Sequence, residues 1–169
     1  MVIGHLLKIY PAMKGSPMEN NARLSLKHLN IILIASAAII LSSSLEVLIR
    51  VKDSGLFEIW KENALLAGFF TQNNPPTFDD YVVGEMFRYM FRIIIPIGFS
   101  LFSYYTYKKL RLNRLFIFVW SVLLLGGMAY TFFELNFNSI FYYIVLIGFV
   151  VMLITVLSLN EEIRNNKNL

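Results

Sequence analysis

The chain has 169 residues, of which 57% are hydrophobic and 15% are aromatic. That is too much apolar surface for an ordinary soluble domain of this size, so a membrane is the expected solvent. The net charge of +4 does not indicate nucleic-acid binding, because the basic residues are scattered or stand at the ends of apolar runs. The absence of cysteine excludes disulfides and thiolate catalysis, and with only two histidines we expect no metal site and no cofactor.

Residues 29–49 form the first apolar run that is long enough to cross a hydrocarbon core of about 30 Å. The run begins too far from the N-terminus for the apolar core of a secretory signal, so we expect it to be retained as a helix. Ala35, Ala38 and Ser42 recur at intervals of three and four residues along one face, which leads up to Glu46. Because small residues let helices approach closely, these three are predicted to bind a partner.

A long and mostly polar connection, residues 50–85, follows the first span. Asp53 or Ser54 can cap a helix there, and apolar residues that include Trp60 recur at helical spacing as far as Phe70. We expect this to be an amphipathic helix that lies on the outer membrane surface or over the bundle. Trp60 is a further candidate for partner binding.

The second span is predicted over residues 86–107. Thr77 and Asp80 match the capping-box pattern, so the helix is expected to begin outside the hydrocarbon. Counting about 20 positions back from the basic turn that follows the span places Arg88 at the outer boundary and Arg92 roughly one turn inside it. Charges at that depth are costly and are expected to be paired.

Two further spans are predicted over residues 115–134 and 140–159, separated by a short hairpin. Tyr130 and Glu134 share one face of the third span. The four spans, their outer connection and the two terminal segments form a single membrane domain.

Basic residues predict the orientation of the chain. Residues 1–28 contain four Lys or Arg, residues 108–114 contain four, and residues 160–169 contain two, whereas the hairpin after Glu134 contains none. By the positive-inside rule, the N-terminal segment, the basic turn and the tail are expected in the cytoplasm. The abundance of Ile, Phe, Asn and Lys favours a bacterial plasma membrane.

The candidate ligand-binding site is a cluster of polar residues at the outer boundary, made of Glu46, Arg88, Arg92, Glu134 and Tyr130. The charges fall at similar depth, and the cost of unpaired charge in hydrocarbon favours pairing of Arg92 with Glu46 or Glu134. One interpretation is structural, with ion pairs that fix helix register or arginines that reach toward water. The other is an outward-facing pocket that binds an anionic group. No catalytic motif occurs, and no catalytic residue is predicted.

The sequence therefore predicts an all-α integral membrane protein, a four-transmembrane-helix bundle with an amphipathic helix in its first extracytoplasmic connection. Its expected partners are the lipid bilayer and either another membrane protein or further copies of itself. The leading functional hypothesis is an accessory, regulatory or protective subunit of a larger membrane protein. The alternatives are a homo-oligomeric channel or carrier with an outward-facing anion site, and an enzyme that acts on lipid headgroups at the outer surface.

Overall fold

The computed structural model describes residues 24–71, 73–109 and 112–165. Over these residues the fold is helical and has no strand, and the helices are α1 (Leu26–Lys52), α2 (Ser54–Leu66), α3 (Phe78–Lys108), α4 (Arg114–Phe133) and α5 (Ile140–Asn165). Helices α1, α3, α4 and α5 are each long and apolar enough to cross a membrane. The prediction of four such helices is confirmed. Residues 1–23 and 166–169 lie outside the described residues, and they include most of the predicted cytoplasmic N-terminal segment and the end of the predicted cytoplasmic tail.

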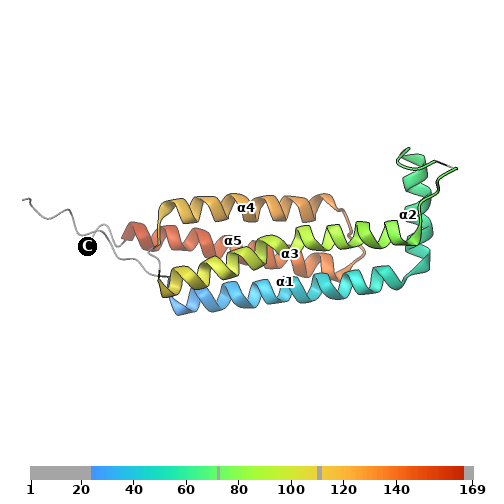
Figure 1. The fold of residues 1–169 in the computed structure, drawn as a ribbon. Coiled ribbons are helices and arrows are strands. Elements are labelled where there is room, and N and C mark those ends of the chain that lie inside the picture. The colour runs from blue at the N-terminus through green and yellow to red at the C-terminus, as the bar shows by residue number, and fades with distance from the viewer. Residues whose placement is uncertain (1–23, 72, 110–111, 166–169) are drawn as a thin grey trace, which may run out of the picture.

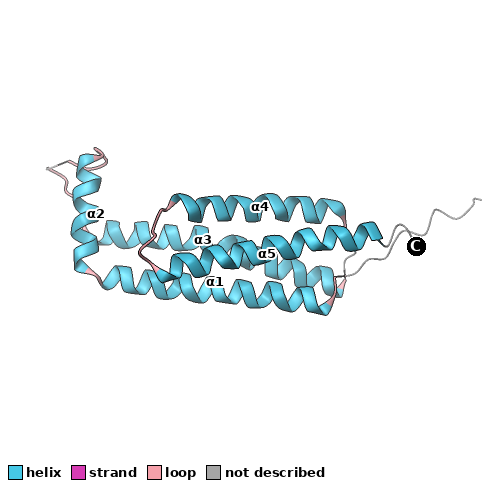
Figure 2. Ribbon diagram, turned by 180° about the vertical axis from the view of Figure 1, so that it is seen from behind, coloured by secondary structure: helices cyan, strands magenta, loops and turns pink. Residues whose placement is uncertain are grey.

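The four long helices run antiparallel to their neighbours, and α2 crosses one end of the bundle (Figure 1). Around the bundle, α1 packs on α3 and α5, and α4 packs on α5 and α3, with α3 and α4 touching each other least. Helix α1 starts and α5 ends at the same end of the bundle, opposite α2 (Figure 2). Since α1 and α3 are longer than α4, they extend beyond the hairpin between α4 and α5 (Figure 1).

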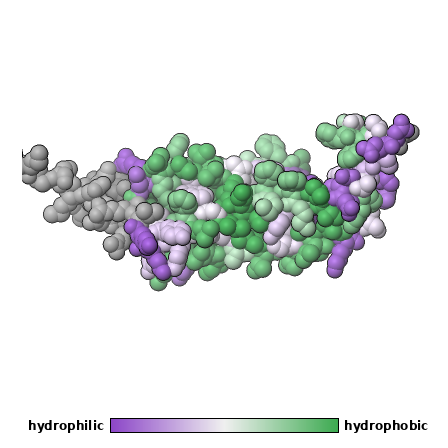
Figure 3. Space-filling model, in the orientation of Figure 1, coloured by the Kyte–Doolittle hydropathy of each residue, from purple (hydrophilic) through white to green (hydrophobic). Residues whose placement is uncertain are grey.

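The outer surface of the bundle is apolar. Hydrophobic residues form a band between two polar ends (Figure 3), and large apolar side chains such as Ile34, Ile94, Phe118 and Ile154 are exposed on all four long helices. Exposed apolar surface of this extent is stable only in contact with lipid or another protein. The fold thus defines a multi-pass membrane protein.

The beginning of α2 and the beginning of α3 are determined by local side chains, as predicted. The Asp53 carboxylate accepts hydrogen bonds from the backbone N–H groups of Gly55, at 2.9 Å, and Leu56, at 3.3 Å. At α3, the Thr77 N–H donates to Asp80 Oδ2 at 2.9 Å, and the Asp80 N–H donates to Thr77 Oγ1 at 3.3 Å. Each carboxylate or hydroxyl thus satisfies N–H groups that have no partner within the helix.

Helix α2 is shorter than the sequence pattern predicts, because it ends at Leu66 and not near Phe70. Gly68 has a φ of 74°, a left-handed conformation that glycine adopts without steric cost. The N–H groups of Gly68 and Phe69 then donate back to the carbonyls of Leu65 and Ala64 at 3.1 and 3.2 Å. These two bonds form a Schellman motif, which ends the helix.

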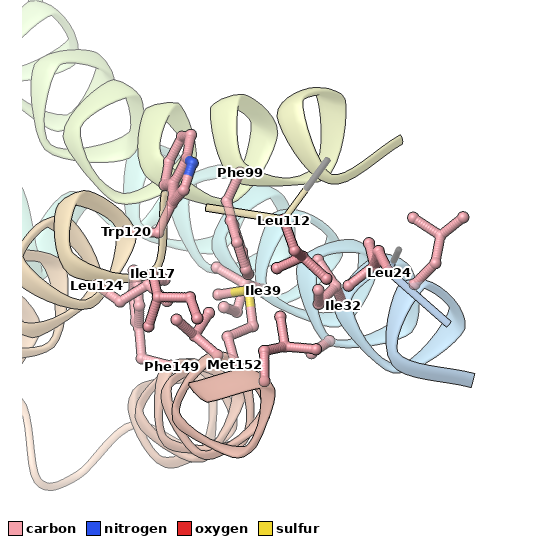
Figure 4. Close-up of a cluster of buried hydrophobic side chains, with 14 of the residues drawn as sticks. Leu24, Ile32, Ile39, Phe99, Leu112, Ile117, Trp120, Leu124, Phe149 and Met152 are labelled. Carbon is pink, nitrogen blue, oxygen red and sulfur yellow. The ribbon is translucent and has the colours of Figure 1, made fainter. Parts of the chain in front are cut away.

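The core of the bundle lies in the half away from α2, where α1, α3, α4 and α5 contribute buried side chains (Figure 4). Gly148 of α5 allows close packing on α1, and Gly127 of α4 allows close packing on α5. A Cβ at Gly148 would lie 2.6 Å from Ile39 Cγ1, and one at Gly127 would lie 2.7 Å from Phe149 Cε1. The helix pairs α1/α5 and α4/α5 therefore approach to distances that larger residues would not permit.

Candidate functional site

The centre of the polar cluster is Arg92, which joins three helices. Its Nη1 donates to Glu46 Oε2 on α1, and its Nη2 donates to Glu134 Oε2 at the end of α4. The side chains of Arg92, Glu46 and Glu134 are only 4%, 5% and 9% exposed. The planar fork of arginine is suited to holding two carboxylates at once, so Arg92 ties α1, α3 and α4 together.

Asn136 completes this part of the cluster from the hairpin between α4 and α5. Its Nδ2 donates to the second carboxylate oxygen of Glu46, Oε1, at 2.8 Å. Leu135, just before it, has a φ of 50°, which turns the chain sharply after Glu134. The hairpin thus places an acid and an amide on the same side of the bundle.

A second set of ion pairs continues the network outward along α1 and α3. Glu85 is buried and accepts two hydrogen bonds from Arg50, Nε to Oε2 at 2.8 Å and Nη2 to Oε1 at 3.1 Å. Arg88 Nη1 also contacts Glu85, at 3.2 Å from Oε1, and Arg88 Nε lies 3.8 Å from Glu134 Oε1. Arg88 therefore links the outer pair to the inner triad.

The network is balanced in charge and closely packed. It contains three arginines and three glutamates, so its net charge is zero when all six are ionised. The cavity between the two sets of ion pairs has a volume of about 10 Å³ and is lined mainly by these charged residues with Ser43, Val47 and Tyr89. That volume corresponds to about one water molecule and is too small for a phosphate or a carboxylate ligand.

Two polar atoms of the network have no hydrogen-bond partner among the described residues. They are Arg92 Nε and Glu134 Oε1. Ser43 Oγ, beside the cavity, likewise has no hydrogen-bond partner among these residues. Buried polar atoms are normally paired, so a site of this size with donors and acceptors around it is suited to a water molecule.

The structure brings together four of the five predicted ligand-binding residues. Glu46, Arg88, Arg92 and Glu134 lie in one network, and the expected pairing of Arg92 is present with both carboxylates. Tyr130 lies beside this network: it is 38% exposed, packs on Phe91 with ring centroids 5.9 Å apart, and interacts electrostatically with Glu134. A ligand-binding role for these residues remains a prediction.

Arg50 and Asn136 were not singled out in the sequence. Arg50 stands four residues after Glu46 and therefore on the same helix face, so helical spacing was an available signal. Asn136 had no such signal, because its position depends on the conformation of the hairpin. Glu85 stands three residues before Arg88 on the same helix face, and it binds both Arg88 and Arg50.

The predicted partner-binding residues largely contact other parts of the same chain. Ala35 and Ser42 are buried in the bundle, and Ala38 lies in an apolar groove between α1 and α5. Trp60 packs on Tyr81 of α3, with ring centroids 5.5 Å apart, and on Phe70. The small-residue face of α1 is therefore occupied in part by α5.

Together the fold and the network define the class of protein as a four-span helical bundle with a neutral, closely packed ion network near one end. No protein-family model, no curated protein and no solved structure matches the chain. A functional proposal must therefore be based on the geometry of this bundle.

Proposed function

We propose that this protein is a plasma-membrane protein with both termini in the cytoplasm and that it binds a larger membrane protein as an accessory, regulatory or protective subunit. The observation that carries the proposal is a contrast between two surfaces. Charged groups inside the bundle are matched to one another around a cavity of about 10 Å³. The helix that crosses the end of the bundle instead exposes large apolar side chains.

Helix α2 has one face that packs on α3 and one that is open. Phe57 lies against Phe78 and Tyr81, with ring centroids 5.5 and 5.7 Å away. On the open side, Ile59 and Leu66 are 59% and 79% exposed, and they lie seven residues apart and thus on one face. Phe69, in the turn that follows, is 82% exposed. We refer to Ile59, Leu66 and Phe69 as the α2 surface.

The positive-inside rule places α2 on the outer side of the membrane. The helix crosses the end of the bundle and so runs roughly parallel to the membrane plane (Figure 1). An apolar strip in that position can bind the extracellular part of a partner protein or lie against the lipid headgroups. We favour the partner, because the α2 surface lies at the end of a helix hairpin that extends beyond the α4–α5 turn.

The packing of the bundle gives less support to the two alternatives. An anion path that continues along the face of Arg88 and Arg92 would need Phe99 and Ser103 to contact water, and both are fully buried. An enzyme that uses Glu46 or Glu134 as acid or base would need a carboxylate that can reach a substrate. Both carboxylates are held by Arg92.

The test is site-specific photo-crosslinking in the native membrane, followed by gentle purification and mass spectrometry. A photoreactive amino acid replaces Ile59 or Leu66 on the α2 surface, and Glu58, which is exposed on another face of the same helix, serves as the matched control position. We expect one membrane protein to be crosslinked from Ile59 and Leu66 and not from Glu58. Recovery of a lone monomer, with crosslinks to lipid only, would refute the proposal, and crosslinks to a second copy would replace it with a homo-oligomer.

A further inference from the structure

A second surface of the bundle, at the end opposite α2, combines an apolar groove with unpaired positive charge. The groove lies between α3 and α4, the two neighbouring helices that touch least, and has a volume of about 300 Å³. Its floor is formed by Thr106 and Trp120, which are 1% and 8% exposed. Its rim is formed by Phe102, Leu115 and Val119, which are exposed to the surroundings of the bundle.

Trp120 is the reason that the groove exists. Its indole extends from α4 toward α3 (Figure 4) and packs on Phe99 and Phe102, with ring centroids 5.0 and 5.8 Å away. Gly98 of α3 faces the ring, and a Cβ there would lie 3.3 Å from the indole. A side chain of this size keeps the two helices apart, so the stretch between Trp120 and the turn is open toward the lipid.

Three basic residues stand at the helix ends next to the groove, outside its lining. Lys108 ends α3, Lys109 is its cap, and Arg114 begins α4. All three are exposed, and none of them forms an ion pair with a carboxylate within the described part of the chain. Lys108 contacts the ring of Tyr104, with Nζ 4.7 Å from the centroid. Among the described residues, these three cations are therefore not neutralised by ion pairs, unlike the arginines of the network at the other end.

The depth of the groove matches that of a phospholipid. Trp120 lies six residues into α4, or about 9 Å below the basic turn at about 1.5 Å per residue. In a bilayer whose phosphates lie at the level of the basic residues, the aromatic floor lies beside the first part of the acyl chains. Basic pockets between transmembrane helices are a recurrent type of site for anionic headgroups.

From this combination we infer that the groove between α3 and α4 binds an anionic phospholipid from the leaflet at the basic-turn end. Lys109 and Arg114, at the two helix ends beside the groove, contact the phosphate, and one acyl chain lies along Trp120 between the two helices. A zwitterionic lipid binds less well, because its positive headgroup is repelled by these cations, which form no ion pair within the described part of the chain. The site depends on the bilayer alone and on no protein partner, so it stands or falls independently of the function proposed above.

The chain offers a direct probe of this site, because it has only two tryptophans, Trp60 and Trp120. In a Trp60→Phe variant all tryptophan fluorescence comes from the floor of the groove. The variant is reconstituted in phosphatidylcholine vesicles that contain a small fixed fraction of a quencher lipid, brominated in the upper part of its acyl chains. The quencher is phosphatidylglycerol in one series and phosphatidylcholine in the other.

We expect brominated phosphatidylglycerol to quench Trp120 more strongly than brominated phosphatidylcholine at equal mole fraction. One basic side chain near an anionic headgroup is worth about a fivefold change in binding constant. Lys109→Gln and Arg114→Gln should each reduce the preference by about that factor, whereas Lys61→Gln on α2 should leave it unchanged. With the basic turn unsubstituted, a higher salt concentration should also lower the preference for phosphatidylglycerol. This measurement does not depend on how the Lys109 and Arg114 variants insert into the vesicles.

A depth-matched control separates a defined site from general attraction of anionic lipid to the basic end. Ile154 of α5 is 62% exposed and lies six residues before Asn160 at the same end of the bundle, so Ile154→Trp in a chain without Trp60 and Trp120 reports on ordinary lipid contact. The preference for phosphatidylglycerol should be several-fold larger at Trp120. Equal quenching by both lipids at Trp120, an equal preference at the two positions, or shielding of Trp120 from both lipids by a second copy would each overturn the inference.

Discussion

Replacing Arg92 by methionine should destabilise the bundle more than any other single change in the ion network. Methionine keeps the length and much of the volume of the arginine stem but removes the charge and both hydrogen bonds. The carboxylates of Glu46 and Glu134 would then remain buried, with only Asn136 and the more distant Arg88 among the described residues to compensate them.

Two independent magnitudes indicate the size of the effect. Removing one partner of a buried ion pair typically costs about 3 to 5 kcal/mol, because the other charge is left without compensation. Insertion of an unpaired charge into a membrane helix costs about 2.5 to 3.5 kcal/mol. Asn136 and Arg88 partly stabilise the remaining carboxylates, so we expect a loss of about 3 kcal/mol in the free energy of unfolding.

The measurement is unfolding of the purified protein in mixed micelles at increasing mole fractions of SDS, followed by far-ultraviolet circular dichroism. Arg88→Met is the matched control, because it makes the same chemical change one turn away at a side chain that is 37% exposed. Glu85 would keep its two hydrogen bonds from Arg50, so this control should lose about 1 kcal/mol or less.

A third variant tests whether the loss comes from uncompensated charge. Combining Arg92→Met with Glu46→Gln and Glu134→Gln removes the cation and both anions together, so most of the stability should return. The reasoning is refuted if Arg92→Met costs no more than Arg88→Met, or if the triple variant is less stable than Arg92→Met alone.

Three smaller effects should follow from the same structure. Glu46→Gln should cost about 1.5 kcal/mol in the SDS assay, less than Arg92→Met, because Arg92 keeps Glu134 and Asn136 can still donate to the amide oxygen. Gly148→Ala should cost about 1 to 3 kcal/mol, since its Cβ would lie 2.6 Å from Ile39. The control Gly126→Ala places a Cβ that meets nothing within 4 Å, so it should be neutral or stabilising by up to about 1 kcal/mol. Equal effects of the two substitutions would contradict the packing of α1 on α5. Thr77→Ala should speed amide hydrogen exchange in the first turn of α3 and cost about 1 kcal/mol by loss of the capping box, and unchanged exchange there would show that α3 begins independently of Thr77.

Much of the helical structure could be predicted from the sequence because it depends on local causes. Run length and apolar composition predicted the four long helices, and the side chains of Asp53, Thr77 and Asp80 predicted where α2 and α3 begin. The end of α2 also has a local cause, but the apolar pattern that continues to Phe70 concealed it. Gly68 was the signal, since a left-handed residue ends a helix whatever the periodicity beyond it.

The candidate site was less predictable because its contacts join distant parts of the chain. Helical spacing could place Glu46, Arg88, Arg92 and Glu134 at similar depth, and the cost of unpaired charge favoured their pairing. It could not show that Arg92 binds both carboxylates, since that requires α1, α3 and α4 to meet at one point. Nor could it show that Arg50 binds Glu85, which neutralises a further carboxylate and closes the cavity.

The sequence by itself determined that this protein is a four-span helical membrane protein, because span length, hydropathy and capping depend on residues close together in the chain. Only the tertiary structure decided which contacts its charged residues make and where grooves form. Whether an arginine is available to a ligand depends on the carboxylates that neighbouring helices bring to it, and inside this bundle Arg92 is paired with two of them. Whether two helices leave a groove depends on the side chain between them, and here Trp120 lies between α3 and α4 at the floor of the groove.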